Sequence, residues 1–379
     1  MSTELPVAHR IEPLGDTPAG SMADVGGVAT MQAFVMRALD EVGFVEKALP
    51  LPGPYDAVVQ TTRALISTSD THTVHGGIGP RRDLTLGEEA VGVVYQVGSE
   101  VQDFRPGDRV VVGAVTPDWL SEEAQAGHGS QSTRALGGWK YANTRDGVFA
   151  EYFLVNQADA NMALVPETVA DEAAVYCSAT MSTGFLGAEN AGIVVGGSVA
   201  IFGQGPIGLM ATAGARLRGA GLIIAVESVA KRKDLALHYG ADVVVDYTSI
   251  DPVQAILDLT GGKGVDAAIE ALGADVTLQN AIKVTRPGGT ISNIGYHGHG
   301  EYLHIPRVEW GVGMAEKTIK TGLCPGGRLR LERLLRLLEN GRVDPTRMTT
   351  HTYLFSQLDD AFTLMDKKLD GVIKPLIVF

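Results

Sequence analysis

Three glycines in this chain, Gly203, Gly205 and Gly208, have a spacing that suits them to bind a phosphate-containing ligand. They follow the apolar, β-branched run 199–202 and precede an alanine-rich helical pattern that extends to about Arg218. In such a strand, turn and helix, the first glycine lets the chain reverse and the second lets the backbone approach a pyrophosphate. The third lets the helix lie against the strand. The helix N-terminus then offers free N–H groups and partial positive charge to the phosphates. The stretch therefore predicts a dinucleotide-binding turn.

A carboxylate follows at the distance this turn requires. Glu227 ends the next apolar run, about 20 residues after the last glycine, where dinucleotide-binding folds hydrogen-bond the adenosine ribose. A carboxylate there accepts hydrogen bonds from both ribose hydroxyls and repels a 2′-phosphate, although Lys231, Arg232 and Lys233 would partly offset that repulsion. The sequence therefore predicts that the cofactor is NAD(H), with NADP(H) less favoured. The alternative interpretation of Glu227 is a solvated residue at the end of a strand. The predicted cofactor-binding residues are Gly203, Gly205, Pro206, Ile207, Gly208, Glu227, Ser228 and Tyr247.

The elements around this turn predict two kinds of domain. Apolar runs at 241–246, 264–270 and 288–295 alternate with helical patterns, which indicates a parallel, doubly wound sheet. Before it, short strands separated by proline and glycine, such as 56–66 and 109–113, indicate a β-barrel-like domain. A helix over 328–340 and a last strand over 373–379 are predicted to return to that domain, so the nucleotide-binding domain is inserted.

These patterns give predicted boundaries. Residues 1–30 are rich in glycine, proline and alanine without periodicity, and we interpret them as a flexible extension. The β-rich domain is assigned to 31–182 and 324–379, and the nucleotide-binding domain to 183–323. Within the first domain, the polar segment 116–146 contains Trp119 and Trp139 and is predicted to be a lid or an oligomer contact.

Composition excludes several classes of function. A formal net charge of −13 and the lack of a basic tract argue against nucleic acid or an anionic membrane as a partner. The chain has only two cysteines, Cys177 and Cys324, so it cannot build a disulfide framework or a four-cysteine zinc lobe. No apolar run reaches the ~18 residues of a membrane helix. We therefore expect a cytoplasmic protein.

The order of motifs resembles the medium-chain dehydrogenase/reductase superfamily, with a GroES-like β domain and a Rossmann domain. The resemblance rests on the glycine turn together with G-E-E-A-V-G (87–92), F-R-P-G-D-R-V (104–110) and V-T-R-P-G-G-T (284–290). More specifically, T-P-D-W (116–119), G-W-K-Y-A-N (138–143) and K-T-I-K-T-G-L-C-P-G-G-R-L-R (317–330) are similar to bacterial tetrameric secondary-alcohol dehydrogenases. This implies an oxidoreductase that transfers hydride between a nicotinamide cofactor and a secondary alcohol or ketone.

The resemblance also implies a catalytic zinc, but the ligand positions differ. Where the group has cysteine, histidine and aspartate, this chain has Ser67, Glu88 and Ala179. A neutral hydroxyl and a methyl group are not adequate zinc ligands, so the sequence predicts no metal. A rearranged site using Glu88, Glu89 and Cys177 is the alternative.

The proton-relay residues of the group are retained. Ser69 matches its hydroxyl member, and His72 lies at the position that passes a proton between the substrate oxygen, the hydroxyl, the cofactor ribose and solvent. Without zinc, Ser67, Ser69 and a protonated His72 are predicted to stabilise the developing oxyanion. Glu88, if buried beside Glu89, is a second candidate proton donor and is ranked below the serine and histidine.

Three functions remain open from the sequence. The first is a zinc-independent, NAD(H)-dependent alcohol dehydrogenase or ketone reductase. The second is an NAD(P)H-dependent C=C reductase of enals or enones, because its enolate oxygen needs no metal. The third is a non-catalytic NAD-binding protein.

The substrate and the assembly are predicted from the resemblance alone. Trp139, Tyr296 and Met314 are predicted to line the substrate cleft, which suits a small apolar carbonyl or alcohol. A homotetramer is expected, with a homodimer as the alternative.

Overall fold

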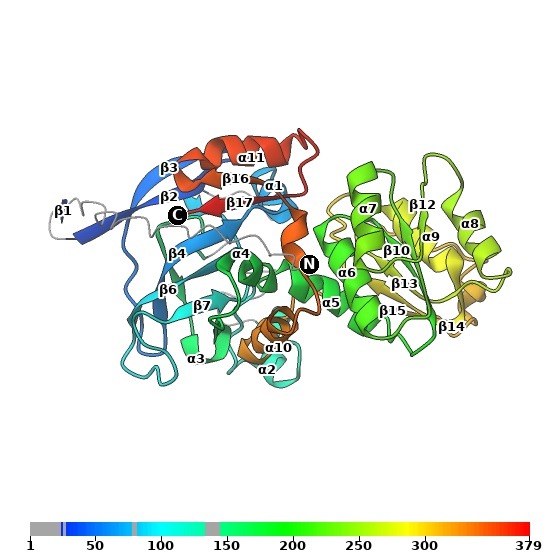
Figure 1. Cartoon of the computed structure of the whole chain (residues 1–379), viewed down its shortest axis with the longest axis horizontal. Helices are drawn as coiled ribbons and strands as arrows, with labels where there is room; N and C mark the ends of the chain where they lie inside the picture. Colours follow the sequence, from blue (N-terminus) through cyan, green and yellow to red (C-terminus); the bar gives the residue numbers. More distant parts are fainter. Residues whose placement is uncertain (1–23, 26–27, 78–81, 133–144) are drawn as a thin grey trace, which may run out of the picture.

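The computed structural model describes residues 24–25, 28–77, 82–132 and 145–379 (Figure 1). The predicted N-terminal extension and Trp139 therefore lie largely or wholly outside the described residues. Strand β2 (Val28–Ala38) already begins at Val28, which is earlier than the predicted start of the β-rich domain at residue 31. It pairs antiparallel with β3 (Glu41–Ala48), so the chain is held in a hairpin from that point on.

The first lobe is built on two β-sheets, as the GroES-like resemblance implied. The larger sheet has the order β16-β17-β4-β6-β7-β9, with β8 also paired to β4, and the smaller contains β1, β2, β3 and β5. Their remaining bounds are β1 Asp24–Val25, β4 Ala57–Leu65, β5 Leu84–Thr85, β6 Glu89–Val97, β7 Arg109–Val112, β8 Tyr152–Val155, β9 Met162–Leu164, β16 Thr349–Leu354 and β17 Lys374–Val378. Alternating apolar residues from these strands, such as Val59, Ala90 and Ile377, form its hydrophobic core.

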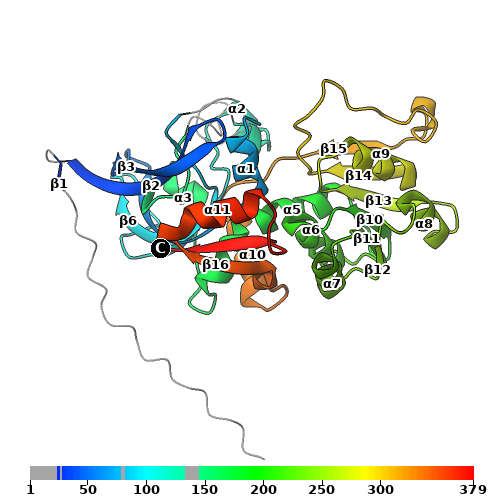
Figure 2. The ribbon, with the colours of Figure 1, turned by 90° about the horizontal axis from the view of Figure 1, so that it is seen from above.

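The second lobe is a parallel doubly wound sheet with the order β12-β11-β10-β13-β14-β15. The strands are β10 Ser198–Phe202, β11 Leu222–Val226, β12 Val243–Val245, β13 Val265–Glu270, β14 Thr285–Asn293 and β15 Thr318–Thr321. Helices cover both faces of the sheet (Figure 2): α6 (Pro206–Leu217) and α7 (Ala230–Tyr239) on one, α8 (Pro252–Leu259) and α9 (Asp275–Val284) on the other. The order reverses beside β10, and ligands of such sheets bind where that happens.

The chain then returns to the first lobe, as the sequence predicts. After α10 (Arg328–Glu339) and α11 (Leu358–Asp366), β17 pairs with β4 in the middle of the larger sheet. Helix α5 (Thr180–Asn190) lies between the lobes and packs on α6. The α/β fold with an inserted Rossmann domain is therefore confirmed.

The first lobe also contains short helices. Helix α1 (Thr68–Val74) follows β4, and the described part of the segment 116–146 contains α2 (Glu122–Gln125) and a 3-10 turn at Gly129–Gln131. Helices α3 (Ala158–Asn161) and α4 (Asp171–Ala174) precede α5. Within the described ranges, no helix has the length and apolarity needed to cross a membrane.

Candidate active site

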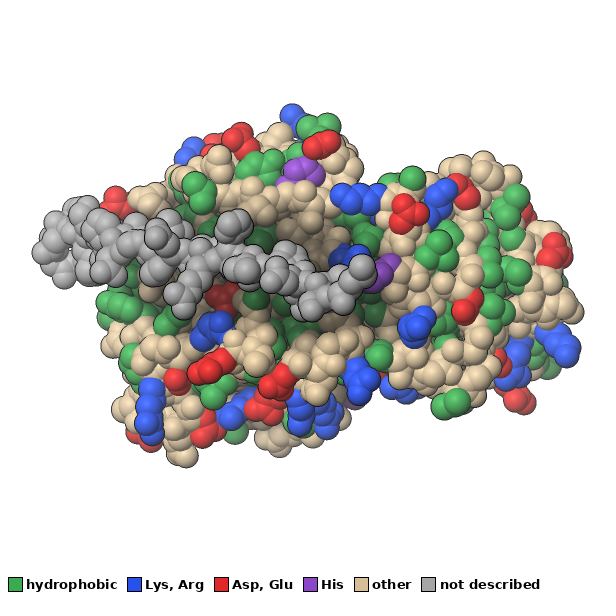
Figure 3. Space-filling model, in the orientation of Figure 1, with side chains coloured by type: hydrophobic (Ala, Val, Ile, Leu, Met, Phe, Trp, Pro, Cys, Tyr) green, Lys and Arg blue, Asp and Glu red, His purple; other side chains and the backbone are tan. Residues whose placement is uncertain are grey.

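A cavity of about 1430 Å³ is lined by residues of both lobes. The first lobe contributes α1, the residues that begin β6, and the first residue of β17. The second contributes the turn between β10 and α6 and the segments that follow β13 and β14. The surface view shows the molecule hollowed between its two lobes (Figure 3). The cavity therefore lies where the carboxyl ends of the parallel strands face the β-rich lobe.

The glycine turn has the local geometry that its spacing predicts. Gly203 has φ of 85°, a conformation that L side chains rarely adopt. A Cβ on Gly208 would lie 1.9 Å from the carbonyl oxygen of Gly203, so only glycine lets α6 approach β10 this closely. A Cβ on Gly205 would meet no atom within 4 Å, and Gly205, Pro206 and Ile207 line the cavity. Open space in front of a helix N-terminus fits the pyrophosphate of a dinucleotide.

Glu227 lines the same cavity, but its carboxylate is already occupied. It accepts hydrogen bonds from the backbone N–H groups of Ser228 (2.8 Å), Val229 (3.0 Å) and Gln204 (3.1 Å). Nη1 of Arg232 lies 3.9 Å from Oε2 of Glu227, and Arg232 also lines the cavity. The negative charge at this position is therefore shared with three amides and a guanidinium.

The other predicted cofactor residues lie next to this carboxylate. The hydroxyl of Ser228 donates to the hydroxyl oxygen of Tyr247 at 2.9 Å, which joins the ends of β11 and β12. A second cation, Lys368, lines the cavity from the loop after α11. Burial, and then the charge of Arg232, lower the pKa of Lys368 to about 8. Two cations from the two lobes therefore act on each other at this end of the cavity.

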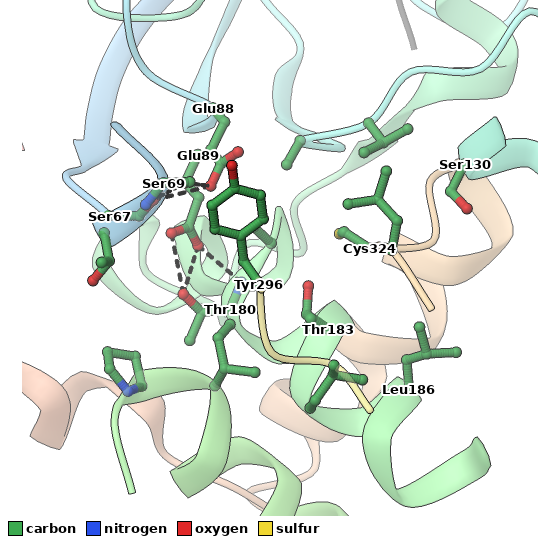
Figure 4. A pocket seen from close by; sticks show the side chains of 18 of the residues that line it. Ser67, Ser69, Glu88, Glu89, Ser130, Thr180, Thr183, Leu186, Tyr296 and Cys324 are labelled. Carbon is green, nitrogen blue, oxygen red and sulfur yellow. Dashed lines mark hydrogen bonds between the residues drawn. The ribbon is translucent and has the colours of Figure 1, made fainter. Parts of the chain in front are cut away.

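A cluster of hydroxyl and carboxyl groups also lines the cavity (Figure 4). Ser67 is the N-cap of α1, where its Oγ accepts from the N–H of Ser69 at 3.2 Å. Oε1 of Glu88 accepts from Oγ of Ser67 at 3.0 Å and from Oγ of Ser69, and the two serine hydroxyls contact each other. Three predicted catalytic residues are thus brought together in one hydrogen-bonded group.

Two buried groups that the sequence analysis missed support this cluster. Asp70 completes the capping box of α1, accepting from the N–H of Ser67 at 2.8 Å and from the N–H of Gly87 at 3.1 Å. Lys374, whose side chain is 2% exposed, contacts Glu89 through its ammonium. Glu89 also accepts from the N–H (2.9 Å) and hydroxyl of Thr180. The spacing of Ser67 and Asp70 is a capping-box signature, and one lysine in an apolar last strand indicates a buried partner.

Burial changes the acidity of these carboxyl groups. Burial, and then the charge of Glu89, raise the pKa of Glu88. Burial, and then the charge of Glu88, raise the pKa of Asp70 to about 7. Three carboxyl groups face one ammonium here, so like-charge repulsion favours holding a proton in the cluster.

His72 lines the cavity next to Tyr296, three residues from Ser69 on the same helix. Its ring centroid lies 5.2 Å from that of Tyr296, whose hydroxyl donates to the carbonyl oxygen of Gly77 at 2.6 Å. Burial, and then the charges of Lys368, His299 and His75, lower the pKa of His72. This disfavours the protonated imidazole that the sequence analysis assumed, and no hydrogen bond joins His72 to Ser69 among the described residues.

The structure describes two of the three predicted lining residues, Tyr296 and Met314, and only one of them lines the cavity. Tyr296 lines it, but Met314 follows the short 3-10 turn Gly311–Gly313 with its side chain 78% exposed and is not part of the lining. In a single chain Met314 lies away from the cavity, because the segment between β14 and β15 extends away from the sheet (Figure 2), and its place at the substrate cleft stays a prediction. Trp139 falls outside the described residues.

The residues present do not fit a catalytic zinc. Ser67, Glu88 and Ala179 occupy the positions identified from the sequence, and only Glu88 offers a metal-binding atom with charge. Cys177 is fully buried against Met181, and burial raises the pKa of its thiol, so it does not join Glu88 and Glu89 in a rearranged site. Among the described residues, no group of three or more His, Cys, Asp and Glu side chains could hold a metal ion.

Comparisons with known proteins match both lobes. The family model described as "Alcohol dehydrogenase GroES-like domain" matches residues 53–167, and the one described as "Zinc-binding dehydrogenase" matches residues 206–340. The chain is 52% identical to an "NADP-dependent isopropanol dehydrogenase" of Thermoanaerobacter brockii over 92% of this chain and 99% of that one. It is 49% identical to the protein of the same name in Clostridium beijerinckii, over 92% and 100%.

A solved structure shows the same arrangement. Alcohol dehydrogenase TADH from Thermus sp. ATN1 superimposes with a TM-score of 0.84 at 29% identity, and the match covers 92% of this chain and 99% of that one.

These relatives contradict the predicted preference for NAD(H). Both isopropanol dehydrogenases are NADP-dependent by name, which points to NADP(H) instead. A free carboxylate at Glu227 would repel a 2′-phosphate. In the structure three backbone amides hold that carboxylate and Arg232 lies beside it, which weakens the repulsion.

The relatives and the matched family also bear on the metal. The family description implies zinc, whereas the donor atoms of this chain do not fit it.

The sequence identity to these relatives extends over nearly the whole chain, and the glycine turn and the cavity between the lobes are consistent with the same family. The chain belongs to the zinc-type alcohol dehydrogenases of the medium-chain dehydrogenase/reductase superfamily, within the group of secondary-alcohol dehydrogenases.

Proposed function

We propose that this chain is an NADP(H)-dependent dehydrogenase of secondary alcohols that also reduces the corresponding ketones. The observation that carries the proposal is the single cavity that joins the glycine turn to the cluster of Ser67, Ser69 and Glu88. The relatives named isopropanol dehydrogenases support a small secondary alcohol as the substrate class.

The residues at the glycine turn fit the cofactor. Open space at Gly205 and the N-terminus of α6 would accept the pyrophosphate, and Arg232 and Lys368 offer positive charge for a 2′-phosphate. When bound, NADPH supplies the hydride that reduces the carbonyl carbon.

The substrate end of the cavity is suited to an apolar molecule. Leu186 of α5, Ile294 and Tyr296 line the same cavity as the hydroxyl cluster. Figure 4 shows Leu186 and Cys324 on the side opposite Ser67, Ser69 and Glu88. A small ketone can therefore place its oxygen at the hydroxyls and its alkyl groups against carbon.

We further propose that this reaction runs without zinc, that Ser69 passes a proton to the substrate oxygen, and that His72 exchanges protons with solvent. Hydroxyl groups aimed at a developing oxyanion in a dry site contribute ~3 kcal/mol each, so they can take over part of the work of a Lewis acid. His72 is three residues from Ser69 and lines the cavity, which suits a neutral base that exchanges protons with solvent.

The test compares cofactors and substrates on one purified sample. We expect NADPH-linked reduction of acetone and NADP⁺-linked oxidation of isopropanol, both resistant to a chelator. Reduction of an enone to the saturated ketone, without activity on acetone, would select the C=C reductase instead. Tight binding of NADPH without turnover of either substrate would select a non-catalytic binding protein.

We also propose that the chain forms a homotetramer. The segment that contains Met314 carries several further exposed apolar side chains, Leu303, Ile305, Val308 and Val312. Exposed apolar patches of this kind mark protein contacts. Light scattering of the purified protein should give four times the chain mass of 39.9 kDa, and a monomer would contradict the proposal.

A further inference from the structure

We propose that the carboxyl group of Glu88 is the acid that protonates the substrate oxygen, acting through the hydroxyl of Ser69. This inference rests on the proposed function, and it gives a chemical role to the residue that replaces a zinc ligand. It requires a carboxyl group that holds a proton, faces a group able to pass it on, and opens into the substrate cavity.

The partners of the three carboxyl groups distinguish Glu88 from its neighbours. Both oxygens of Asp70 accept from backbone N–H groups, and Glu89 accepts from the N–H and hydroxyl of Thr180 and from the ammonium of Lys374. Backbone amides and an ammonium only donate, so these partners cannot take a proton from either carboxyl group. Glu88 contacts two serine hydroxyls, which can donate or accept.

The position of the cluster favours a proton on Glu88. The charge of Glu89 acts on Glu88, and the charge of Glu88 acts on Asp70. Among the described residues only one ammonium, that of Lys374, makes an ion pair within the cluster, with Glu89. Burial and the charge of Glu89 raise the pKa of Glu88, in agreement with this geometry. One carboxyl of the group is therefore kept neutral next to the cavity.

The hydroxyl of Ser69 connects Glu88 to the substrate. Oγ of Ser69 contacts Oε1 of Glu88 and is exposed to the cavity, whereas Ser67 is buried as the N-cap of α1. Ser67 also donates to Oε1, so it holds the carboxyl in place. Ser67 is therefore a positioning residue, and Ser69 and Glu88 are the catalytic pair.

In the direction of reduction, the carbonyl carbon forms a C–H bond with the hydride that bound NADPH would supply, and the C=O π pair moves to the oxygen. The oxygen takes the hydroxyl proton of Ser69, while Ser69 takes the carboxyl proton of Glu88. The products are the alcohol, NADP⁺ and an ionised Glu88, which regains its proton from solvent. Oxidation of the alcohol is the reverse.

The test uses Glu88→Gln, Ser69→Ala and the control Glu339→Gln on the exposed end of α10. An amide keeps the size and polarity of the carboxyl but cannot transfer a proton. We expect Glu88→Gln and Ser69→Ala to lower kcat for acetone reduction by on the order of 10²-fold while NADPH binding, followed by nicotinamide fluorescence, stays unchanged. The control should match the unsubstituted protein in both measurements.

Infrared difference spectroscopy gives a readout that does not depend on turnover. At neutral pH the unsubstituted protein should show the C=O stretch of a protonated carboxyl group that persists in Asp70→Asn and disappears in Glu88→Gln. Absence of that band, or a Glu88→Gln variant within threefold of the normal kcat, overturns the assignment of Glu88 alone. Failure of the unsubstituted protein to reduce any ketone with NADPH overturns the proposed function, and the assignment with it.

Discussion

At the scale of single residues, the site is governed by a shortage of positive charge. Asp70, Glu88 and Glu89 lie together, and the ammonium of Lys374 is held by Glu89 with its side chain 2% exposed. Burying a charge without a partner is costly, so the ion pair and the raised carboxyl pKa values are two consequences of the same crowding.

Substitution Lys374→Met tests the ion pair. It leaves the carboxylate of Glu89 buried without its cation, so we expect the free energy of unfolding to fall by about 3–5 kcal/mol in a urea titration. The exposed Lys367→Met serves as the control and should change little. Adding Glu89→Gln to Lys374→Met should recover part of the loss; an additive further loss would contradict the pairing.

Two substitutions at His72 separate a chemical role from a packing role. Phenylalanine keeps an aromatic ring beside Tyr296 but has no ring nitrogen, whereas asparagine removes both the ring and its basicity. If His72 relays protons, both variants should lower kcat for ketone reduction by at least ~10-fold, measured as NADPH consumption. Normal kcat in His72→Phe would show that the ring only packs.

At the scale of elements, two of the three glycines where β10 meets α6 have different tasks. Gly208 permits the close approach of helix and strand, whereas Gly205 faces open space in the cavity. The same substitution at the two positions should therefore affect folding in one case and ligand binding in the other.

Alanine at each glycine makes that comparison. Gly208→Ala must displace backbone, so we expect a loss of stability of ~1–3 kcal/mol in the apo protein. Gly205→Ala should leave the apo melting temperature unchanged but weaken NADPH binding at least ~10-fold, because the methyl group occupies space next to the pyrophosphate. Unchanged NADPH affinity in Gly205→Ala would place the cofactor elsewhere.

Helix α7 carries the cation that offsets Glu227. Substitution Arg232→Ala removes the guanidinium 3.9 Å from that carboxylate, so we expect NADPH affinity to fall about 10-fold and NADH affinity to change much less. The exposed neighbour Lys231→Ala does not line the cavity and is the matched control. Equal loss of NADPH and NADH affinity would contradict a role with the 2′-phosphate.

At the scale of the whole molecule, His75 connects segments that are distant in sequence. Its two ring nitrogens contact Asp40, in the turn between β2 and β3, at 2.6 Å and Asp366, at the end of α11, at 2.7 Å. These hydrogen bonds raise the pKa of His75. The stabilisation is therefore complete below the unfolded pKa of about 6.5 and is lost as pH rises through the higher folded pKa.

Substitution His75→Gln should remove this pH dependence. Because the group is half exposed, the loss in unfolding free energy should be only ~1 kcal/mol at about pH 5.5 and close to zero at about pH 9. The exposed His304→Gln is the control for adding a neutral amide. A loss that is the same at both pH values would contradict the ion pairs.

The sequence predicted the features that depend on local spacing. The glycine turn, the parallel sheet after it and the return of the last strand follow from periodicity and turn residues, and the structure confirms them. The ion pair between Glu89 and Lys374 could not be predicted from the sequence, because 285 positions separate the two residues. The preference for NAD(H) was predicted wrongly from Glu227 for a similar reason, since the backbone amides that donate to its carboxylate are brought there only by folding.

We propose above all that this chain reduces ketones with NADPH and without a metal. The most direct measurement is the metal content, by mass spectrometry, of the same sample whose acetone reduction is assayed before and after chelation. The Ser67→Cys/Glu88→His/Ala179→Asp variant provides the control for zinc uptake. We predict an active protein with far less than one metal ion per chain and a rate that survives chelation. One zinc per chain, with activity lost on its removal, would contradict the account.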